Sequence, residues 1–240
     1  MRRTLRVVGP GRAGGSLAGA LGAAGWRVER PVRRGDDLAG AAAGVDLLVI
    51  ATPDAAIAEV AAAVAPGDAV VAHLAGSLGL DVLAPHERRA AVHPLVSLPN
   101  VDVGAERLRD GAWFAVAGEP IASEVVADLG GHAFAVADAD RAAYHAAACI
   151  ASNHLVALLG QVERVAATAG VPLEAYLDLV RGTVDNVAAL GPAAALTGPA
   201  ARGDWATIDR HLAALDPSER PAYEALMRAA RRLVAPDDPT

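Results

Sequence analysis

The sequence predicts an α/β fold, a doubly wound parallel sheet, followed by an all-helical domain. Strand and helix patterns alternate up to about residue 137, as expected for repeated β-α units on one parallel sheet. From about residue 138 to residue 236, apolar residues recur at helical spacing and no strand pattern is found. We therefore expect two domains, residues 1–137 and residues 138–240.

The predicted strands are short apolar runs that end at turn residues. Val45–Thr52 is a nearly continuous apolar run, typical of a strand that is buried on both faces. The full set of predicted strands is Leu5–Val8, Trp26–Val32, Val45–Thr52, Ala69–Leu74, Ala90–His93, Trp113–Ala117 and His132–Val136. Helices are predicted between them at Ser16–Ala24, Ala55–Val64 and Ile121–Leu129.

The first strand runs directly into a G-x-G-x-x-G sequence, which a helix pattern follows. In a dinucleotide site, Gly9 permits the tight turn, Gly11 lets the backbone approach a pyrophosphate, and Gly14 lets the helix pack on the strand. The N–H groups of Arg12 and Ala13 open the helix, where the helix dipole favours negative charge. The order of strand, glycine turn and helix predicts a Rossmann-type dinucleotide site.

Two arginines follow the second predicted strand and indicate which dinucleotide binds. An NAD site places an acidic residue here, whereas an NADP site places arginine to pair with the 2′-phosphate. Arg33 and Arg34 therefore favour NADP(H). The alternative is a solvated loop in which Asp36 and Asp37 neutralise the pair. Glu29 lies too early in the strand for the acidic role.

Further candidates stand where other strands end, because ligands of open α/β sheets bind at the carboxyl ends of the strands. Thr52 and Pro53 are expected to flank the cofactor ribose. Ser77 and His93 can face the nicotinamide or the substrate; alternatively Ser77 caps a helix and His93 bonds local backbone. His73 lies inside its strand and is expected to be structural.

The composition excludes several classes of function. The formal net charge is −7 without a basic tract, which disfavours nucleic acid as a partner. All 21 basic residues are arginine, so no lysine can act in catalysis. The single cysteine, Cys149, excludes an intrachain disulfide and a cysteine-rich metal site. Apolar runs are interrupted before membrane-spanning length and no signal peptide is recognised, so a cytoplasmic protein without a membrane span or metal is expected.

The second half of the sequence is predicted to form four helices, two before and two after a loop. Two long helices are expected at residues 140–169 and 173–190, and a loop rich in glycine and proline covers residues 191–203. Asp204 can cap a helix that runs to Leu215, and Asp216-Pro217-Ser218 starts the last helix.

The long helix carries a polar stripe on an otherwise Ala/Val/Leu surface. His145, Cys149 and Asn153 recur every four residues and share one face, with Ser152 beside them. Burying such a stripe without partners is costly, so it indicates a ligand or polar packing between helices. Histidine can donate a proton near neutral pH, and Asn153 can bond a carbonyl oxygen. Cys149 is expected to be a small packing residue.

The loop at residues 191–203 holds two more candidates. Thr197 lies among glycine and proline residues, which suggests a shaped loop. Arg202 can clamp a substrate carboxylate in bidentate fashion. The alternative role of Arg202 is an ion pair with Asp204 or with a helix end.

Together these segments resemble a group of Rossmann-type oxidoreductases whose helical C-terminal domain is a domain of unknown function. The group is related to the 6-phosphogluconate dehydrogenase-like and pyrroline-5-carboxylate reductase-like superfamily. The resemblance rests on Gly9 to Gly14, on Tyr144-His145-Ala146-Ala147-Ala148 with Ser152-Asn153, and on Ala195-Leu196-Thr197-Gly198-Pro199 with Arg202-Gly203-Asp204.

The resemblance implies an NAD(P)-dependent reductase and a homodimer built through the helical domain. Some members are thought to act as ketopantoate reductases in pantothenate synthesis. Better-known ketopantoate reductases use a helix-borne lysine four residues before an asparagine, and here Cys149 stands in that place. We therefore expect His145 or a bound water to supply the proton, Asn153 to orient the oxygen and Arg202 to hold a carboxylate.

Ketopantoate is the leading substrate hypothesis. The alternatives are an imine reductase of the pyrroline-5-carboxylate type, which needs less help from an acid, and a deazaflavin-dependent NADP reductase by fold analogy. A protein that binds NADPH as a sensor or scaffold without turnover is the non-enzymatic alternative.

Overall fold

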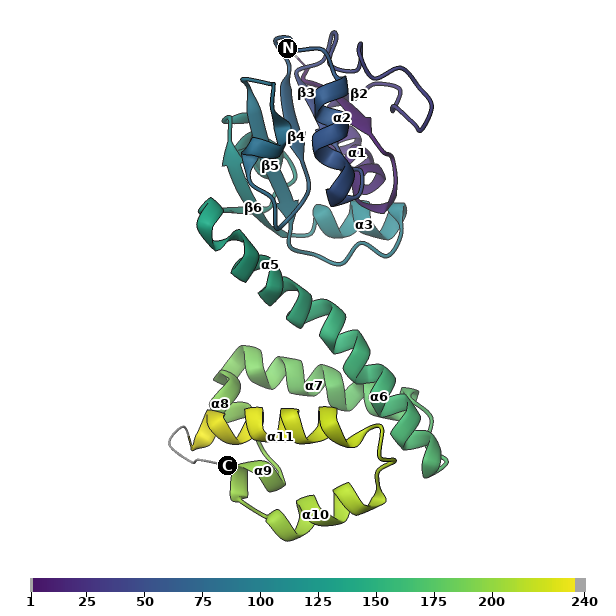
Figure 1. Ribbon diagram of the computed structural model, residues 1–240, viewed down its shortest axis with the longest axis vertical. Coiled ribbons are helices and arrows are strands. Elements are labelled where there is room, and N and C mark those ends of the chain that lie inside the picture. Colours follow the sequence, from purple (N-terminus) through teal and green to yellow (C-terminus); the bar gives the residue numbers. More distant parts are fainter. Residues whose placement is uncertain (1, 236–240) are drawn as a thin grey trace. The chain divides into compact units, whose positions relative to one another are not determined.

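A computed structural model describes residues 2–235 of the chain and divides it into two compact units (Figure 1). The first unit is Met1–Ser152 and the second is Asn153–Thr240. The last strand ends at Ala135, near the expected domain boundary at residue 137, whereas the division between the compact units falls further along the chain.

The first unit is built on a seven-stranded sheet with the order β2-β1-β3-β4-β5-β6-β7. Register pairs such as Leu5↔Leu47 and Leu47↔Val70 align the central strands in parallel. The strands are β1 Thr4–Val8, β2 Arg27–Val28, β3 Leu47–Ile50, β4 Val70–His73, β5 Arg89–Pro94, β6 Trp113–Gly118 and β7 His132–Ala135. The chain moves from β1 outward to β2 and then back across β1 to β3, so the direction of winding switches at β1.

The alternation of side chains along the strands creates a core on each face of the sheet. On one face, Leu5, Val7, Leu47 and Val49 pack with helices α1 (Arg12–Ala23), α3 (Val101–Leu108) and α4 (Ile121–Asp128). On the other, Val8, Leu48 and Ile50 pack with α2 (Ile57–Ala63) and the short helix η2 (Leu80–Leu83). Because both faces are covered, β3 and β4 are buried throughout.

The predicted doubly wound sheet is parallel except at one pair of strands. Strand β6 pairs antiparallel to β5, with Val92 opposite Val116. The chain between them contains α3, which the sequence analysis did not predict; Asn100 caps it by accepting a hydrogen bond from the amide of Val103 at 2.9 Å. The prediction of a long strand at Trp26–Val32 was wrong: β2 has two residues, and Val32 forms only an isolated bridge to Val8.

The predicted long helix is one helical run, Asp138–Thr168, with a change of pitch in its middle. It comprises η3 (Asp138–Asp140), α5 (Arg141–Cys149), the π-helical segment η4 (Ile150–His154) and α6 (Leu155–Thr168). Such π segments insert one extra residue into a turn and are frequent at functional sites. By length and composition this is the one helix among residues 2–235 that could cross a membrane, with a mean hydropathy of 1.3 and no buried residue in its most apolar window.

The second unit continues with helices only, and no strand follows β7 within the described residues up to 235. Helix α7 is Glu174–Leu190, α10 is Trp205–Ala214 and α11 is Arg220–Val234. Asp204 caps α10 as predicted, by accepting a hydrogen bond from the amide of Thr207. The predicted loop at residues 191–203 in fact forms two single-turn helices, α8 (Pro192–Ala195) and α9 (Pro199–Arg202), each with proline in its first turn.

Candidate functional site

The glycine turn has the geometry of a dinucleotide cradle. Gly9 has a φ of +83°, and its amide donates to the carbonyl of Val32 at 3.0 Å. A Cβ on Gly14 would lie 2.6 Å from the carbonyl oxygen of Gly9 and 2.8 Å from Val7 Cγ1, so α1 packs more closely on β1 than any side chain would allow. By contrast, a Cβ on Gly11 would meet no atom within 4 Å. The space beside Gly11 is open, as the approach of a pyrophosphate requires.

The start of α1 offers groups for an anion. Gly11 is the N-cap and provides no side-chain cap, and the first turn holds no acidic residue. The N–H groups at Arg12 and Ala13 therefore open a helix whose dipole favours negative charge. Next to this turn, at the end of β3, the hydroxyl of Thr52 is buried without a hydrogen-bond partner among the described residues. A buried orphan hydroxyl beside a glycine turn fits a ribose or phosphate oxygen.

Arg33 and Arg34 are placed directly beside this turn, because the carbonyl of the preceding Val32 is bonded to Gly9. Both arginine side chains are exposed, and neither forms an ion pair among the described residues. Asp36 instead pairs with Arg30 and accepts from the backbone amide of Arg33 at 2.9 Å. The pair is therefore not neutralised by Asp36, and the residues present fit a dinucleotide that carries a 2′-phosphate.

The loop after β3 meets the loop after β4. Pro53 precedes the short helix η1 (Asp54–Ala56), and the hydroxyl of Ser77 donates to Asp54 at 3.3 Å. This contact ties Ser77 to the same carboxyl edge of the sheet as Thr52. The contact joins two side chains, and in it the Ser77 hydroxyl does not cap a helix.

A histidine and tyrosine cluster stands further along the same edge. His93, at the end of β5, has its Nδ1 atom 2.6 Å from the hydroxyl oxygen of Tyr144 on α5. The ring of His145 lies 5.7 Å from that of His93, and Phe134 on β7 contacts the Tyr144 ring edge-on. The structure thus brings the predicted residues His93 and His145 together.

Gly76, in the loop after β4, closes this cluster. A Cβ at Gly76 would lie 2.5 Å from His145 Nδ1 and 2.8 Å from His93 Nε2, so only glycine fits between the two rings. His145 Nδ1 is buried without a hydrogen-bond partner in the described chain, and its Nε2 lies 3.7 Å from Cys149 Sγ. The Nδ1 atom of His145 therefore faces the protein interior, and the Nε2 atom faces the thiol of Cys149.

Burial sets the protonation states of His93 and Tyr144. Desolvation, together with the nearby His145, lowers the pKa of His93 to about 4. Desolvation also raises the pKa of Tyr144. Near neutral pH the pair is therefore a neutral imidazole hydrogen-bonded to a protonated phenol.

His73 is structural, as predicted. Its Nδ1 accepts a hydrogen bond from the amide of Ala75, and its Nε2 lies 3.2 Å from the carbonyl oxygen of Gly79. These bonds fix the loop that carries Gly76 and Ser77.

Sequence reasoning missed Arg141, in the first turn of α5. Its side chain is 1% exposed, and its Nε donates to Asp138 at 2.8 Å. Both terminal nitrogens are buried with no hydrogen-bond partner among the described residues. The charge of Arg141 contributes to keeping His93 neutral. No motif marked this residue, which lies one position after the expected start of the long helix.

The other predicted site residues belong to the second unit. Asn153 is exposed and lies in the π-helical segment, and Ser152 beside it donates to the carbonyl of Ala148. Arg202 is exposed and forms no ion pair with Asp204 among the described contacts; the low pKa of Asp204 comes first from its bonds to Thr207. Thr197 lines a small apolar pocket of about 260 Å³.

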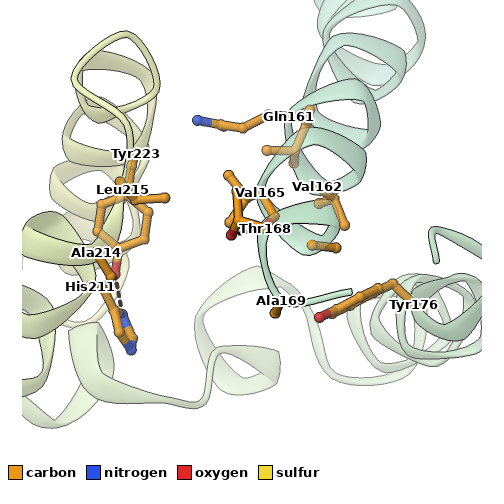
Figure 2. A pocket seen from close by; sticks show the side chains of 12 residues that line it. Gln161, Val162, Val165, Thr168, Ala169, Tyr176, His211, Ala214, Leu215 and Tyr223 are labelled. Carbon is orange, nitrogen blue, oxygen red and sulfur yellow. Dashed lines mark hydrogen bonds between the residues drawn. The ribbon is translucent and has the colours of Figure 1, made fainter. Parts of the chain in front are cut away.

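The second unit also holds a larger apolar pocket of about 480 Å³. Figure 2 shows side chains of α6 on one side of it and of α10 and α11 on the other. Its polar feature is the pair His211 and Tyr223, whose Nδ1 and hydroxyl oxygen lie 2.7 Å apart. Among residues 2–235, no cluster of three His, Cys, Asp or Glu side chains gathers to hold a metal ion.

Comparison with known proteins places the chain by domain and by fold. Residues 115–230 match the model of a domain of unknown function, DUF2520. No curated protein matches the chain. The match begins within β6, covers β7 and runs into α11, and it agrees with the expected resemblance to Rossmann-type proteins that carry a domain of unknown function.

Three solved structures share the fold over nearly the whole chain. A proposed NADP oxidoreductase from Bacteroides fragilis is 22% identical with a TM-score of 0.79, covering 96% of this chain and 98% of its own. The reductive aminase of Aspergillus terreus, solved with NADPH and ethyl-5-oxohexanoate, is 16% identical with a TM-score of 0.71, covering 97% and 94%. The pyrroline carboxylate reductase of Plasmodium falciparum, solved with NADP, is 13% identical with a TM-score of 0.61, covering 97% and 98%.

Proposed function

We propose that this protein is an NADP(H)-dependent reductase of a small carbonyl or imine compound that carries a carboxylate. One observation supports the proposal most: a dinucleotide cradle and a histidine and tyrosine cluster share the carboxyl edge of one sheet. Gly9 and Thr52 follow the parallel strands β1 and β3, and His93 is the next-to-last residue of β5. A hydride donor and a proton donor at one edge are the two components that such a reduction needs.

The residues of the cradle have separable roles in binding the cofactor. The open backbone at Gly11 and the N–H groups at Arg12 and Ala13 hold the pyrophosphate, with Gly9 and Gly14 shaping the turn. Thr52 and Pro53 flank the ribose. NADPH, when bound, supplies the hydride.

Arg33 and Arg34 select the phosphorylated cofactor over NADH. Their guanidinium groups are free of ion pairs in the described chain and present planar donors suited to a phosphate.

The remaining predicted residues serve the substrate in this proposal. Ser77 and the cluster of His93, Tyr144 and His145 lie at the reacting end of the substrate. The sequence analysis selected His145 as the proton donor, but the Nδ1 atom of His145 is buried against Gly76. Asn153, Thr197 and Arg202 stay candidates for orienting the substrate and binding its carboxylate.

The leading substrate is ketopantoate, a branched 2-oxo acid. The second candidate is a cyclic imino acid, because a reductive aminase and a pyrroline carboxylate reductase share the fold. An imine is reduced with less help from an acid, which suits a chain that has no lysine. NADPH oxidation with each compound, followed by the near-ultraviolet absorbance of NADPH, distinguishes the two. Tight NADPH binding without turnover on any substrate would support a sensor or scaffold instead.

The protein is also proposed to be a homodimer that joins through its helical unit. Among residues 153–235, Ala166 and Ile208 are the buried hydrophobic residues, whereas Val156 is 70% exposed and Leu179 is 67% exposed. The same unit carries an open apolar pocket lined by residues of α6, α10 and α11. A helical unit with so little buried core gains stability when a second copy covers it. Light scattering at several concentrations, without detergent, measures the mass and also separates this dimer from membrane association.

A further inference from the structure

We infer that Tyr144, hydrogen-bonded to His93, delivers the proton to the substrate, and that His145 does not contact the substrate directly. This inference rests on the proposed function and names the proton donor within the cluster. The contact of 2.6 Å between His93 Nδ1 and the Tyr144 hydroxyl oxygen is the observation that carries it.

Each nitrogen of His145 has a protein atom as its neighbour. Nδ1 is buried against Gly76, where a single added methyl group would lie 2.5 Å away. Nε2 lies 3.7 Å from Cys149 Sγ. A proton donor must reach the substrate within hydrogen-bond distance. The buried Nδ1 of His145 cannot make that contact, and its Nε2 is engaged by Cys149.

Tyr144 is held in place from two strands. His93 on β5 bonds its hydroxyl group, and Phe134 on β7 packs edge-on against its ring at a centroid distance of 5.7 Å. The phenol is only partly buried. A rigid, partly accessible hydroxyl at the carboxyl edge of the sheet can approach an oxygen or nitrogen on a substrate placed there.

The protonation states suit this role. The phenol keeps its proton at neutral pH because desolvation raises the pKa of Tyr144. The imidazole stays neutral because desolvation, His145, Arg141 and His73 outweigh the opposing charge of Asp54 in setting the pKa of His93. With its one ring proton on Nδ1, His93 donates to the phenol oxygen and leaves the phenol proton free to move to the substrate.

The proton transfer balances as follows. Bound NADPH would supply a hydride to the substrate carbon, and the C=O or C=N electron pair would then move onto the oxygen or nitrogen. That atom takes the proton of Tyr144, and the O–H electron pair stays on Tyr144 as a phenolate. The Nδ1–H of His93 stabilises the phenolate until water reprotonates it. Tyr144 is thus the catalytic residue, and His93 is a positioning residue.

The test is a mutant cycle on the substrate that the wild-type protein reduces. Tyr144→Phe removes only the hydroxyl group and keeps the ring packed on Phe134. We expect it to lower kcat by roughly 10²–10⁴-fold with an unchanged Kd for NADPH. Tyr176→Phe, in the second unit, is the matched control and should change neither value. His145→Gln should lower kcat less than Tyr144→Phe does.

The role of His93 is tested by asking whether the effect of its replacement on kcat requires the Tyr144 hydroxyl group. His93→Ala should lower kcat in the wild-type background and have almost no further effect in Tyr144→Phe, because residues that act as a unit are not additive. His93→Asn places an amide nitrogen near the position of Nδ1 and should restore part of the loss. Equal losses from His93→Ala in both backgrounds would contradict the proposed coupling.

The outcomes separate this inference from the proposed function. Wild-type protein that reduces no substrate overturns both. Turnover that survives Tyr144→Phe but is lost in His145→Gln overturns the assignment of the proton donor alone and leaves the reductase intact.

Discussion

His93 Nδ1 and the Tyr144 hydroxyl oxygen lie 2.6 Å apart although 51 positions separate these residues in the chain. The contact joins the end of β5 to the first turns of α5, at the sheet edge that also carries the glycine turn. It places a neutral donor pair where open α/β sheets bind their ligands. The chemistry of the first unit can therefore be tested residue by residue.

Replacing Arg33 and Arg34 by alanine should weaken NADPH binding and leave NADH binding unchanged. Each lost charge-assisted bond to a phosphate costs about 1.5 kcal/mol or more, or roughly tenfold in Kd. Fluorescence titration with both cofactors measures the change. Arg30→Ala is the control, because Arg30 is exposed and pairs with Asp36. Equal losses for NADPH and NADH would contradict a 2′-phosphate site.

Gly14→Ala should lower the stability of the fold, whereas Gly11→Ala should lower the affinity for NADPH. A Cβ added at Gly14 would lie 2.6 Å from a backbone oxygen, so Gly14→Ala should destabilise the fold by about 1–3 kcal/mol through overpacking. Gly11→Ala meets no protein atom within 4 Å, so it should keep the wild-type Tm and lose affinity for NADPH. Thermal melts and cofactor titrations measure both values. A Gly11→Ala protein with wild-type NADPH affinity would place the pyrophosphate elsewhere.

Acidification should destabilise the first unit through His93. Its pKa is about 4 in the folded state against 6.5 for the free side chain, so the unfolded state binds the proton first. The contribution of neutral His93 to the free energy of unfolding is fully present above pH 6.5 and is lost as the pH falls toward 4. Desolvation by burial is the main cause of the low pKa of His93; His145, Arg141 and His73 lower that pKa further and Asp54 raises it, while Tyr144 is hydrogen-bonded to the ring.

Urea unfolding at stepped pH values measures that loss. His93→Asn should reduce the decline in the free energy of unfolding between pH 6.5 and 4. His154 is an exposed histidine in the second unit, so His154→Asn should leave this decline unchanged. An identical slope in wild type and His93→Asn would show that His93 is not held neutral.

Val156→Asp and Leu179→Asp should convert the proposed dimer to a monomer. A charge placed on a surface that a second copy covers must be buried without a partner, which is strongly unfavourable. Trp113→Gln is the control, because Trp113 is 53% exposed but lies in the first unit. Sedimentation equilibrium gives the mass of each variant. A wild-type monomer at every concentration would refute the dimer.

The parts of this structure that depend on local spacing could be predicted from the sequence. The glycine turn follows from three glycines at fixed offsets, and the Asp204 cap follows from its place before a helical pattern. The buried strands β3 and β4 were evident because both faces are covered, which leaves a continuous apolar run.

The parts that depend on distant contacts could not be predicted. Strand direction is set by the path of the chain through α3, and α3 itself was missed because glycine and charged residues obscure its periodicity, although Asn100 was an available cap signal. Tyr144 was visible beside His145, yet only the folded chain shows that it meets His93. Arg141 is a charged residue whose burial no local pattern indicates.

The measurement that tests the central claim most directly is cofactor oxidation by the wild-type protein. NADPH and NADH are compared with ketopantoate, other branched 2-oxo acids, β-oxo acids and pyrroline-5-carboxylate. We predict turnover of at least one carboxylate-bearing carbonyl or imine with a clear preference for NADPH. Tight NADPH binding with no turnover on any of these compounds would contradict the reductase and favour a protein that only senses the cofactor.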